Sequence, residues 1–311
     1  MNKEYILVTG AAGFVGSAVA NRLNSLGFNT ITIDNLSTGE KEVIPSETLF
    51  IEGNLGEQNT INKLNDYTIS AIFHIAGQSS GEISFENPSY DLQSNTESTL
   101  LLLKFAQENK IKHFIYASTM SVYGNQSVLP VVETTNPNPS SFYACGKLAS
   151  ENYLKIYTTL GINVVCLRLF NIYGPGQNMK NLKQGMLSIY LAQALNDSKI
   201  VVKGSVDRFR DFVYIDDVVE AFLKAYKYSE TNSFGTFNIC TNKPRYVYEL
   251  LDNIKKNCDN LIDIEIIDGT PGDQFGIFGS NWKAKNELKW EPKVDFDEGV
   301  QKMISWAKNN I

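Results

Sequence analysis

The segment Tyr5-Ile6-Leu7-Val8-Thr9-Gly10-Ala11-Ala12-Gly13-Phe14-Val15-Gly16 decides the fold, because a short apolar run enters a glycine-rich turn that leads into a helical pattern. Gly10 permits the tight turn, Gly13 lets backbone approach a pyrophosphate, and Gly16 lets the helix pack closely against the strand. The helix N-terminus adds N–H donors and a partial positive charge. The segment therefore predicts a dinucleotide-binding loop.

A carboxylate follows at the end of the next strand-like run, which closes in Ile33-Asp34-Asn35. At that distance from the loop, Asp34 is placed to accept both hydroxyls of an adenosine ribose and to repel a 2′-phosphate. A role as a turn or cap residue is the alternative for Asp34. The combination of loop and acid favours NAD over NADP as the cofactor.

Strand-like and helical stretches alternate through the first half of the chain. The expected strands span residues 5–8, 30–33, 48–51, 71–75, 113–117 and 163–169, and the expected helices span 15–26, 58–64, 91–109 and 142–160. This alternation predicts an α/β Rossmann fold, a doubly wound parallel sheet with helices on both faces and ligands beyond the carboxyl ends of the strands. We expect residues 1–172 to form this NAD-binding domain, with segments near 211–240 returning to it.

The second half is less regular, and residues 173–311 are expected to form mainly a smaller C-terminal α/β substrate-binding domain. Its expected elements are helices at 185–195 and 296–308, a helix after Asp216-Asp217, strands at 199–203 and 264–267, and a turn at Pro271-Gly272-Asp273.

Composition excludes several classes of protein. A net charge of −6, a pI near 5.2 and 43% hydrophobic residues are typical of a globular protein and argue against a nucleic-acid-binding surface. No run of about 18 apolar residues occurs, so we expect a cytoplasmic protein that does not span a membrane. The cysteines form no C-x-x-C pair and both histidines flank apolar runs, which predicts free thiols, packing histidines and no metal site. These residues are Cys145, Cys166, Cys240, Cys258, His74 and His113.

Tyr143 and Lys147 lie one turn apart on a helix that Ser140-Ser141 is expected to start. A free tyrosine has a pKa near 10, so ionising it near neutrality requires a shift of about 3 units, or about 4 kcal/mol. A neighbouring ammonium and a positively charged nicotinamide ring can supply that shift. Tyr143 would then remove a hydroxyl proton while hydride leaves the same carbon. Y-x-x-x-K alone is a common pattern, but Ser118-Thr119 adds small hydroxyls at the carboxyl end of a strand.

Together these features resemble the extended short-chain dehydrogenase/reductase family, in particular its nucleotide-sugar epimerase/dehydratase branch, which includes the UDP-glucose 4-epimerases. The resemblance covers nearly the whole chain. The matching segments are Ser118-Thr119-Met120-Ser121-Val122-Tyr123-Gly124, His74-Ile75-Ala76-Gly77, Asn95, Arg168-Leu169-Phe170-Asn171-Ile172-Tyr173-Gly174-Pro175-Gly176, Arg210-Asp211-Phe212-Val213-Tyr214-Ile215-Asp216-Asp217 and Trp290-Glu291-Pro292.

The resemblance implies the role of each site residue. Thr119 and Tyr143 would hydrogen-bond the sugar C4 hydroxyl, with Tyr143 as base and Lys147 on the nicotinamide ribose. Asn54-Leu55 would meet the adenine, and Phe170-Asn171 would lie between cofactor and substrate. The cofactor residues implied are Gly10, Gly13, Phe14, Val15, Gly16, Asp34, Asn35, Asn54, Leu55, Ala76, Gly77, Asn95, Ser118, Tyr143, Lys147 and Phe170. The substrate residues implied are Ser79, Thr119, Asn171, Asn181, Leu182, Arg210 and Asp273.

Arg210 would bind the nucleotide diphosphate, since a guanidinium suits bidentate phosphate contacts. An ion pair with Asp211 or Asp216 is the alternative for Arg210. The family's basic residue before the Pro-Gly-Asp turn is replaced here by Thr270, and Lys183, Lys203, Arg208 or Arg245 are the cations that could compensate.

Two further departures from the family limit the activity. Dehydratases carry an Asp-Glu pair after the catalytic threonine, where this chain has Met120 and Ser121, so dehydration is disfavoured. Ser79 stands where many galactose epimerases have lysine.

Three functions therefore compete. The leading hypothesis is 4-epimerisation of a nucleotide-linked sugar, and the main rival is a net dehydrogenase that releases a 4-keto nucleotide sugar, a hexose or heptose. A relative that binds NAD without turnover is the third, and the intact Thr119, Tyr143 and Lys147 argue against it. The resemblance also suggests a homodimer formed through the helices 91–109 and 142–160, although burial within one chain would explain part of their apolar pattern.

Overall fold

The computed structural model describes residues 3–182, 185–258, 261–269 and 274–310. Its main feature is a sheet of seven parallel strands in the order β11-β6-β5-β4-β1-β2-β3. The strands are β1 (Glu4–Thr9), β2 (Thr30–Asp34), β3 (Leu49–Glu52), β4 (Thr68–His74), β5 (His113–Thr119), β6 (Asn163–Leu169) and β11 (Phe234–Ile239). The order reverses between β1 and β4, and in such sheets ligands bind in the crevice outside this switch point. The predicted doubly wound parallel sheet is confirmed.

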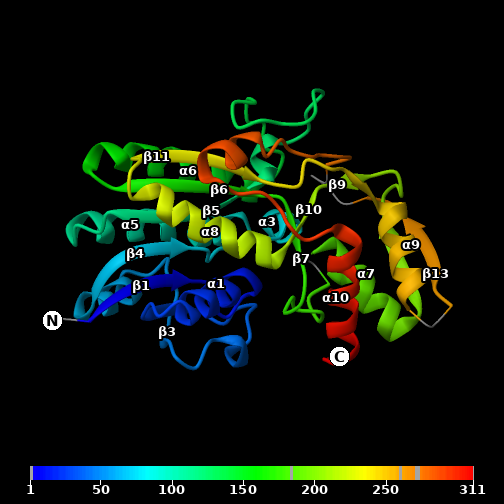
Figure 1. The fold of residues 1–311 in the computed structure, drawn as a ribbon, viewed down its shortest axis with the longest axis horizontal. Coiled ribbons are helices and arrows are strands. Elements are labelled where there is room, and N and C mark those ends of the chain that lie inside the picture. The colour runs from blue at the N-terminus through cyan, green and yellow to red at the C-terminus, as the bar shows by residue number, and fades with distance from the viewer. Residues whose placement is uncertain (1–2, 183–184, 259–260, 270–273, 311) are drawn as a thin grey trace.

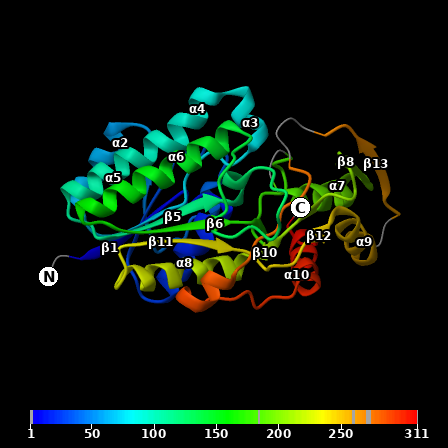
Figure 2. The ribbon, with the colours of Figure 1, turned by 90° about the horizontal axis from the view of Figure 1, so that it is seen from above.

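Helices cover both faces of this sheet, as seen edge-on in Figure 2. One apolar layer contains Ile6 and Val8 with side chains of α1 (Phe14–Ser25) and α8 (Ile215–Ser229). The other contains Leu7 with side chains of α5 (Ser98–Glu108) and α6 (Phe142–Tyr157). Neighbouring residues of β1 thus enter opposite layers, because side chains alternate across a strand.

The predicted helix 91–109 is interrupted in the structure. It consists of α4 (Pro88–Leu92), a π-helical turn η3 (Gln93–Glu97) and α5. A π turn is a one-residue bulge inside an otherwise continuous helix, and the pattern of apolar residues does not predict where such a bulge occurs. The structure also contains α3 (Gly81–Glu86), which the sequence analysis missed; the Ser80 hydroxyl caps it by accepting from the Ile83 N–H at 3.3 Å.

The remaining elements gather beyond the carboxyl ends of the strands, at the right of Figure 1. They include the strand pairs β7–β10, β9–β12 and β8–β13. The strands are β7 (Asn171–Tyr173), β8 (Lys199–Lys203), β9 (Phe209–Arg210), β10 (Phe212–Tyr214), β12 (Arg245–Tyr246) and β13 (Asp263–Ile267). The helices are α7 (Met186–Asp197), α9 (Val247–Asn257) and α10 (Phe296–Lys308). Short helical turns elsewhere are η1 (Lys41–Val43), α2 (Gln58–Asn62), η2 (Lys63–Asp66), η4 (Met120–Tyr123), η5 (Thr158–Leu160) and η6 (Ala284–Leu288).

This second group of elements shares an apolar core with the sheet. Leu187, Leu250 and Met303 belong to the same buried cluster as Val8. The strand β11 lies far along the chain yet forms the edge of the large sheet beside β6. The division of the chain at residue 172 stays a prediction.

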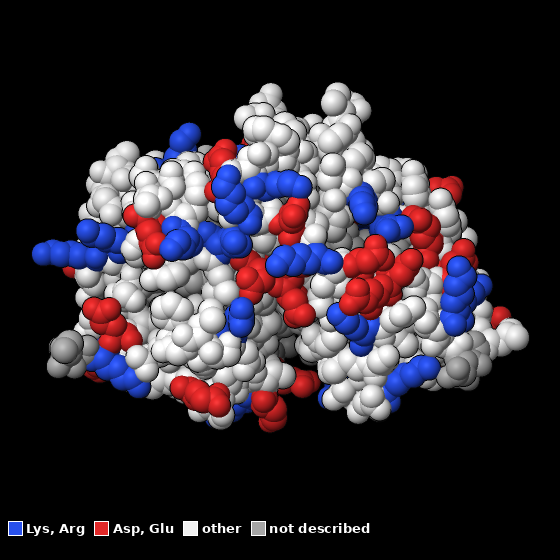
Figure 3. All heavy atoms as spheres, viewed as in Figure 1, with Lys and Arg blue, Asp and Glu red and all other residues white. Residues whose placement is uncertain are grey.

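The surface and the cysteines fit the composition. Figure 3 shows Lys and Arg mixed with Asp and Glu over one face, without a stripe of one sign. In the described part of the chain, no helix has the length and apolar character needed to cross a membrane. All four cysteines are free thiols; Cys145 is exposed and the other three are buried.

Candidate active site

The glycine loop between β1 and α1 packs against the loop after β4. Gly10 has a φ of +73°, and a Cβ there would lie 2.8 Å from the backbone N and Cα of Ala76. A Cβ at Gly16 would overlap the Gly10 carbonyl. Both positions therefore require glycine, for conformation at Gly10 and for close packing at both. The backbone of residues 10–16 therefore forms an open loop with no side chain at its glycines, which we call the glycine cradle.

Asp34 ends β2 beside this cradle. Its Oδ2 accepts from the Ala12 N–H at 2.9 Å, and its Oδ1 accepts from the Leu36 N–H at 2.8 Å. Asp34 thus takes part in the turn, the alternative role that the sequence left open. A carboxylate has about four acceptor positions, so these two bonds leave capacity for ribose hydroxyls. The exposed Asn35 accepts from the Ser37 N–H at 3.1 Å.

A chain of buried hydrogen bonds ties the two loops to η3. Thr9 Oγ1 accepts from the N–H groups of residues 75 and 76, each at 3.0 Å, so its own proton goes to His74 Nδ1 at 2.9 Å. His74 Nε2 then donates to Thr99 Oγ1 at 3.0 Å, and the Thr99 hydroxyl donates to the Asn95 carbonyl at 2.7 Å. Burial lowers the pKa of His74 to about 3, so the imidazole is neutral and holds the loops in place. The predicted packing role of His74 is seen here.

Thr119, Tyr143 and Lys147 come together at the carboxyl end of β5. Ser141 caps α6 by accepting from the Ala144 N–H at 3.2 Å, and this start places Tyr143 in the first turn of the helix. Tyr143 hydrogen-bonds with Thr119. Lys147 is buried, and its Nζ donates to the Ala117 carbonyl at 3.0 Å. The carboxyl end of β5 therefore supplies Thr119, and α6 supplies Tyr143 and Lys147 one helical turn apart.

The pKa values of the pair differ from the sequence-based expectation. Burial raises the pKa of Tyr143 to about 12, although the hydrogen bond from Thr119 partly offsets this. Burial also lowers the pKa of Lys147 to about 8. The expected decrease in the pKa of Tyr143 included the charge of a nicotinamide ring, and without that charge burial determines the direction of the shift. Desolvation of a phenolate outweighs the effect of the ammonium, whose Nζ lies at the Ala117 carbonyl and 4.8 Å from the centre of the Tyr116 ring.

Space and an unused acceptor remain beside Lys147. A Cβ at Gly77 would overlap Asn95 Oδ1 and come within 3.3 Å of Lys147 Nζ, so a glycine keeps this space open. Asn95 Nδ2 donates to the Gln78 carbonyl at 2.9 Å, whereas the buried Asn95 Oδ1 accepts no hydrogen bond within the described residues. Asn171 Oδ1 is a second buried acceptor of this kind. Buried acceptors without donors are costly, so this arrangement fits a ligand that carries hydroxyl and amide donors.

The sequence model of the NAD dependent epimerase/dehydratase family matches residues 6–240. The chain belongs to this family. It is therefore an NAD-dependent enzyme, and its cradle, Asp34 and the acceptors beside Lys147 suit a dinucleotide.

Members and structures of the family resemble this one over nearly the full length. A putative UDP-glucose 4-epimerase of Methanocaldococcus jannaschii is 33% identical over 307 residues, which covers 98% of this chain and 99% of the relative. The crystal structure of UDP-glucose 4-epimerase with UDP-glucose from Thermotoga maritima has a TM-score of 0.94 and 32% identity, with 98% and 99% coverage. The Thermus thermophilus UDP-glucose 4-epimerase complex with NAD has a TM-score of 0.92 and 27% identity, with 99% and 100% coverage.

Other predicted cofactor residues of this epimerase/dehydratase family member lie on strands of the large sheet or directly after them. Ser118 follows Ala117 on β5, and its hydroxyl donates to the buried Glu151. Asn54 Oδ1 accepts from the Gly56 N–H at 3.0 Å, and Leu55 is buried. Phe170 is only 3% exposed, and its ring packs against Gly279.

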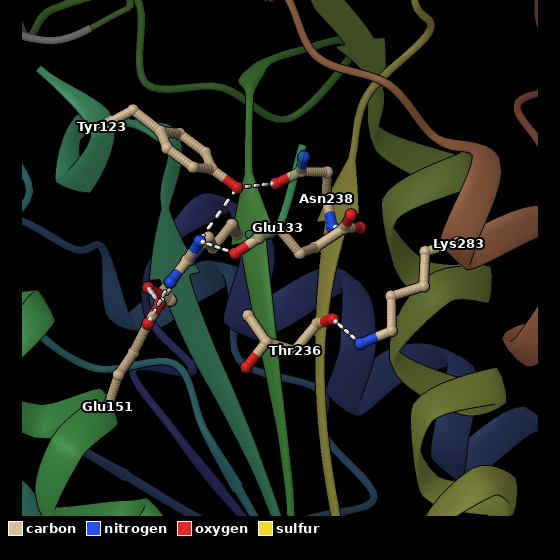
Figure 4. A network of polar contacts seen from close by, with 8 residues as sticks. Tyr123, Glu133, Glu151, Thr236, Asn238 and Lys283 are labelled. Carbon is tan, nitrogen blue, oxygen red and sulfur yellow. Dashed lines mark hydrogen bonds and ion pairs between the residues drawn. The ribbon is translucent and has the colours of Figure 1, made fainter. Parts of the chain in front are cut away.

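A buried ion pair anchors α6, the helix that carries Tyr143 and Lys147, to the sheet. Arg168 on β6 donates to Glu151 on α6 through Nε at 3.0 Å and through Nη2 at 2.7 Å. Its Nη1 donates to the Tyr123 hydroxyl at 2.9 Å, which in turn donates to Asn238 Oδ1 at 2.6 Å. Figure 4 shows this network reaching from α6 across the sheet. Arg168, which the sequence analysis placed in a family motif without a role of its own, thus joins α6 to the sheet.

The predicted substrate residues are more dispersed. Ser79 is exposed on the loop after β4, Leu182 is 52% exposed, and Asn181 is half-buried. Arg210 is buried and donates to the carbonyls of Phe209 and Phe275 at 2.8 and 3.2 Å. The predictions at Asp273, Thr270, Lys183 and the 271–273 turn lie outside the described residues.

Among the cations that could compensate for Thr270, Arg208 lies in the most suitable place. It is 7% exposed, and after burial its charge is the next largest cause that lowers the pKa of Arg210, to about 10. Lys203 instead pairs with Glu82 at 3.5 Å and Arg245 pairs with Glu249 at 3.6 Å. The alternative ion pair of Arg210 with Asp211 is not formed, because the Asp211 carboxylate accepts from the N–H groups of residues 241 and 242.

Sequence reasoning missed two polar residues of the site. Gln78 Nε2 donates to Asp91 Oδ1 at 2.8 Å, and both side chains are buried next to Asn95. Asp91 was predicted to begin a long helix, and its spacing of four residues from Asn95 was the available signal. That spacing is common on exposed helix faces, so burial was needed to recognise the residue.

Proposed function

We propose that this enzyme is a nucleotide-sugar 4-epimerase. The observation that carries the proposal is the convergence of Thr119, Tyr143 and Lys147 at the switch-point end of the sheet, beside the glycine cradle. The names of the similar proteins support the same activity.

The cofactor would lie along the cradle. The loop from Gly10 to Gly16 would hold the pyrophosphate, Asp34 the adenosine ribose, and Lys147 with Asn95 the nicotinamide half. When bound, NAD supplies the oxidant that takes hydride from the sugar C4 and returns it. The proposed roles of Asn35, Asn54, Leu55, Ala76, Ser118 and Phe170 are to line this channel.

Proton transfer would belong to Tyr143. Its phenolate accepts the C4 hydroxyl proton during oxidation, and the phenol returns it when the ketone is reduced. The Thr119 hydroxyl orients the sugar oxygen toward Tyr143. Because burial raises the pKa of Tyr143, the positive charges of Lys147 and of the bound cofactor are needed to make the phenolate accessible.

Dehydration remains unsupported by the residues after Thr119. Met120 and Ser121 begin the turn η4, and the Ser121 N–H donates to Thr119 Oγ1 at 3.1 Å. Neither side chain is an acid or base near neutrality. Elimination of water needs such a group, so oxidation and reduction at C4 are what this site suits.

A product analysis tests the proposal against the net dehydrogenase. The purified protein is incubated with NAD and a panel of nucleoside-diphosphate hexoses, and products are followed by NMR. The expected result is the C4 epimer without accumulation of reduced cofactor. A stable 4-keto sugar with one equivalent of NADH would show that the rival is correct.

Arg208 and Arg210 would together bind the diphosphate, because both side chains are buried and the charge of one acts on the other, which favours an anion between them. Asn171, Asn181, Leu182, Ser79 and Asp273 are the other proposed substrate residues. Arg208→Gln should raise KM for the nucleotide sugar by roughly 10- to 100-fold with little change in kcat, as expected when one charge-assisted hydrogen bond is lost.

The control for this prediction is Arg245→Gln, which removes a cation that is already paired with Glu249. Inhibition by the free nucleoside diphosphate should weaken in Arg208→Gln, whereas inhibition by the nucleoside should not. An unchanged KM in Arg208→Gln would exclude Arg208 from the diphosphate site.

We also propose a homodimer that buries the outer faces of α4, α5 and α6. Apolar side chains are exposed on these helices and on η5 directly after α6: Leu92 is 58%, Ile156 59% and Leu160 50% exposed. Ile156→Asp should convert the protein to a monomer in sedimentation experiments, because a carboxylate would be buried in the interface. Leu261→Asp, at a 91% exposed site far along the chain, is the matched control and should leave the dimer intact. An Ile156→Asp protein that sediments as a dimer would contradict this surface assignment.

A further inference from the structure

Asp91 is a buried carboxylate close to Lys147, and the reaction proposed above gives it no role. It is 1% exposed and lies in α4, one turn before Asn95. Its Oδ1 accepts from Gln78 Nε2 at 2.8 Å and from Asn95 Nδ2 at 3.1 Å. Its Oδ2 faces α6 at Gly146, 3.4 Å from where a Cβ of that glycine would lie. Gly146 is the residue immediately before Lys147.

Lys147 needs a counter-charge. Its side chain is buried, with only 4% of the residue exposed, and its described hydrogen bond goes to a neutral carbonyl, that of Ala117. An isolated ammonium in such surroundings is costly, and it loses its proton more easily than in water. A nearby carboxylate is the group that can keep it charged.

The other ionisable groups around Lys147 cannot serve equally well. Glu151, one turn further along α6, is bound through both oxygens by Arg168. His74 on β4 is neutral, with both ring nitrogens hydrogen-bonded to threonines. Tyr116 on β5 and Tyr143 on α6 are neutral phenols whose pKa values burial raises. Among the described residues, Asp91 on α4 is the other carboxylate that acts on Lys147, and its partners there are two neutral amides.

We propose that Asp91 is a positioning residue whose carboxylate holds Gln78 and Asn95 through Oδ1 and keeps Lys147 in its ammonium form. This inference rests on the proposed role of Lys147 in binding the cofactor ribose. Two separate charge interactions then act on α6: the ion pair of Glu151 with Arg168, which anchors the helix, and the longer-range attraction between Asp91 and Lys147, which keeps Lys147 charged.

The electrostatics of the three groups agree with this assignment. Asp91 is the largest of the influences that raise the pKa of Lys147 against the effect of burial, and Glu151 is the second. The Asp91 charge also raises the pKa of Tyr143. Removal of that charge should therefore lower the pKa of both Lys147 and Tyr143.

Asp91→Asn is a nearly isosteric test. The asparagine Oδ1 can accept the same two hydrogen bonds, so only the charge and the Oδ2 acceptor are lost. The affinity for NAD is measured by calorimetry from pH 6 to pH 9.5. We expect affinity to fall as Lys147 loses its proton, and in Asp91→Asn this fall should begin about 1 pH unit lower than in the wild type. At pH 9 the variant should bind NAD about tenfold more weakly, with nearly equal affinity at pH 6.

A double-mutant cycle separates charge from structure. In a Lys147→Met background, Asp91→Asn should have little further effect on NAD affinity at any pH, because the ammonium that it supports is gone. Glu97→Gln is the matched control, since it removes an exposed carboxylate two residues from Asn95 and should leave the pH profile unchanged. Overlapping profiles of Asp91→Asn and wild type, or an equal loss in both backgrounds, would overturn the proposal.

The binding readout also keeps this inference distinct from the proposed function. If the wild type binds NAD but epimerises no sugar, the pH shift in Asp91→Asn can still be measured and the charge assignment stands. If the wild type is an active epimerase and the variant shows no shift, the function stands and the role of Asp91 fails.

Discussion

Tyr143→Phe is expected to lower kcat by about 10²- to 10⁴-fold, the range that a single acid–base group contributes. The substitution removes only the hydroxyl, which hydrogen-bonds with Thr119 and would take the C4 proton. The ring still packs at the start of α6, so NAD affinity should change by less than about threefold. Epimer formation, measured at saturating substrate, and calorimetric NAD binding check the two expectations separately.

The pH dependence offers a second check on Tyr143. Its pKa is raised, so the phenolate fraction increases with pH through neutrality and kcat/KM of the wild type should rise until Lys147 loses its proton. In Tyr143→Phe this rise should disappear. Tyr157→Phe, the same chemical change at the C-terminal end of α6, is the control and should keep the wild-type profile. Retention of more than a tenth of the activity in Tyr143→Phe would remove Tyr143 from the role of base.

Arg168→Met should destabilise the protein by about 3–5 kcal/mol, because it leaves Glu151 as a buried charge without its guanidinium. The change also removes the hydrogen bond to Tyr123 at 2.9 Å. Through its bonds to Glu151 and Tyr123, Arg168 joins α6 to the sheet. Chemical denaturation followed by circular dichroism measures the free energy of unfolding.

Two further variants show whether the buried charge causes the loss in the free energy of unfolding. Arg168→Met with Glu151→Gln should recover part of the stability, since no buried charge is then left alone. Arg22→Met breaks an exposed ion pair with Glu220 of 3.1 Å and should cost less than about 1 kcal/mol. If Arg168→Met costs no more than Arg22→Met, the buried network is not a major source of stability.

The predictable part of the fold rests on local patterns. The glycine loop needs Gly10 and Gly16 for backbone reasons that any sequence of this kind shares, and both close approaches are present in the structure. The expected strand 163–169 and helix 296–308 match β6 and α10 at both ends. In these segments, the spacing of the apolar residues and the turn residues at the ends predict the same element, so the sequence is enough to locate it.

The missed features depend on distant partners. β11 becomes a strand by pairing with β6, about seventy residues earlier in the chain, and its own sequence is only six residues long. The π turn η3 is stabilised where Asn95 reaches Gln78 and Asp91. The raised pKa of Tyr143 follows from burial, which no spacing of residues expresses.

The sequence by itself determined the glycine loop between a strand and a helix, the position of Asp34 and the spacing of Tyr143 and Lys147, because each is a choice of residue type at a short, defined spacing. The family resemblance added that Met120 and Ser121 stand where dehydratases carry acids. Only the tertiary structure decided which charges lie near one another: Asp91 beside the catalytic helix, Arg208 beside Arg210, and Glu151 bound by Arg168. Electrostatic energies depend on distance and burial in space, and both are set by packing between segments that lie far apart along the chain.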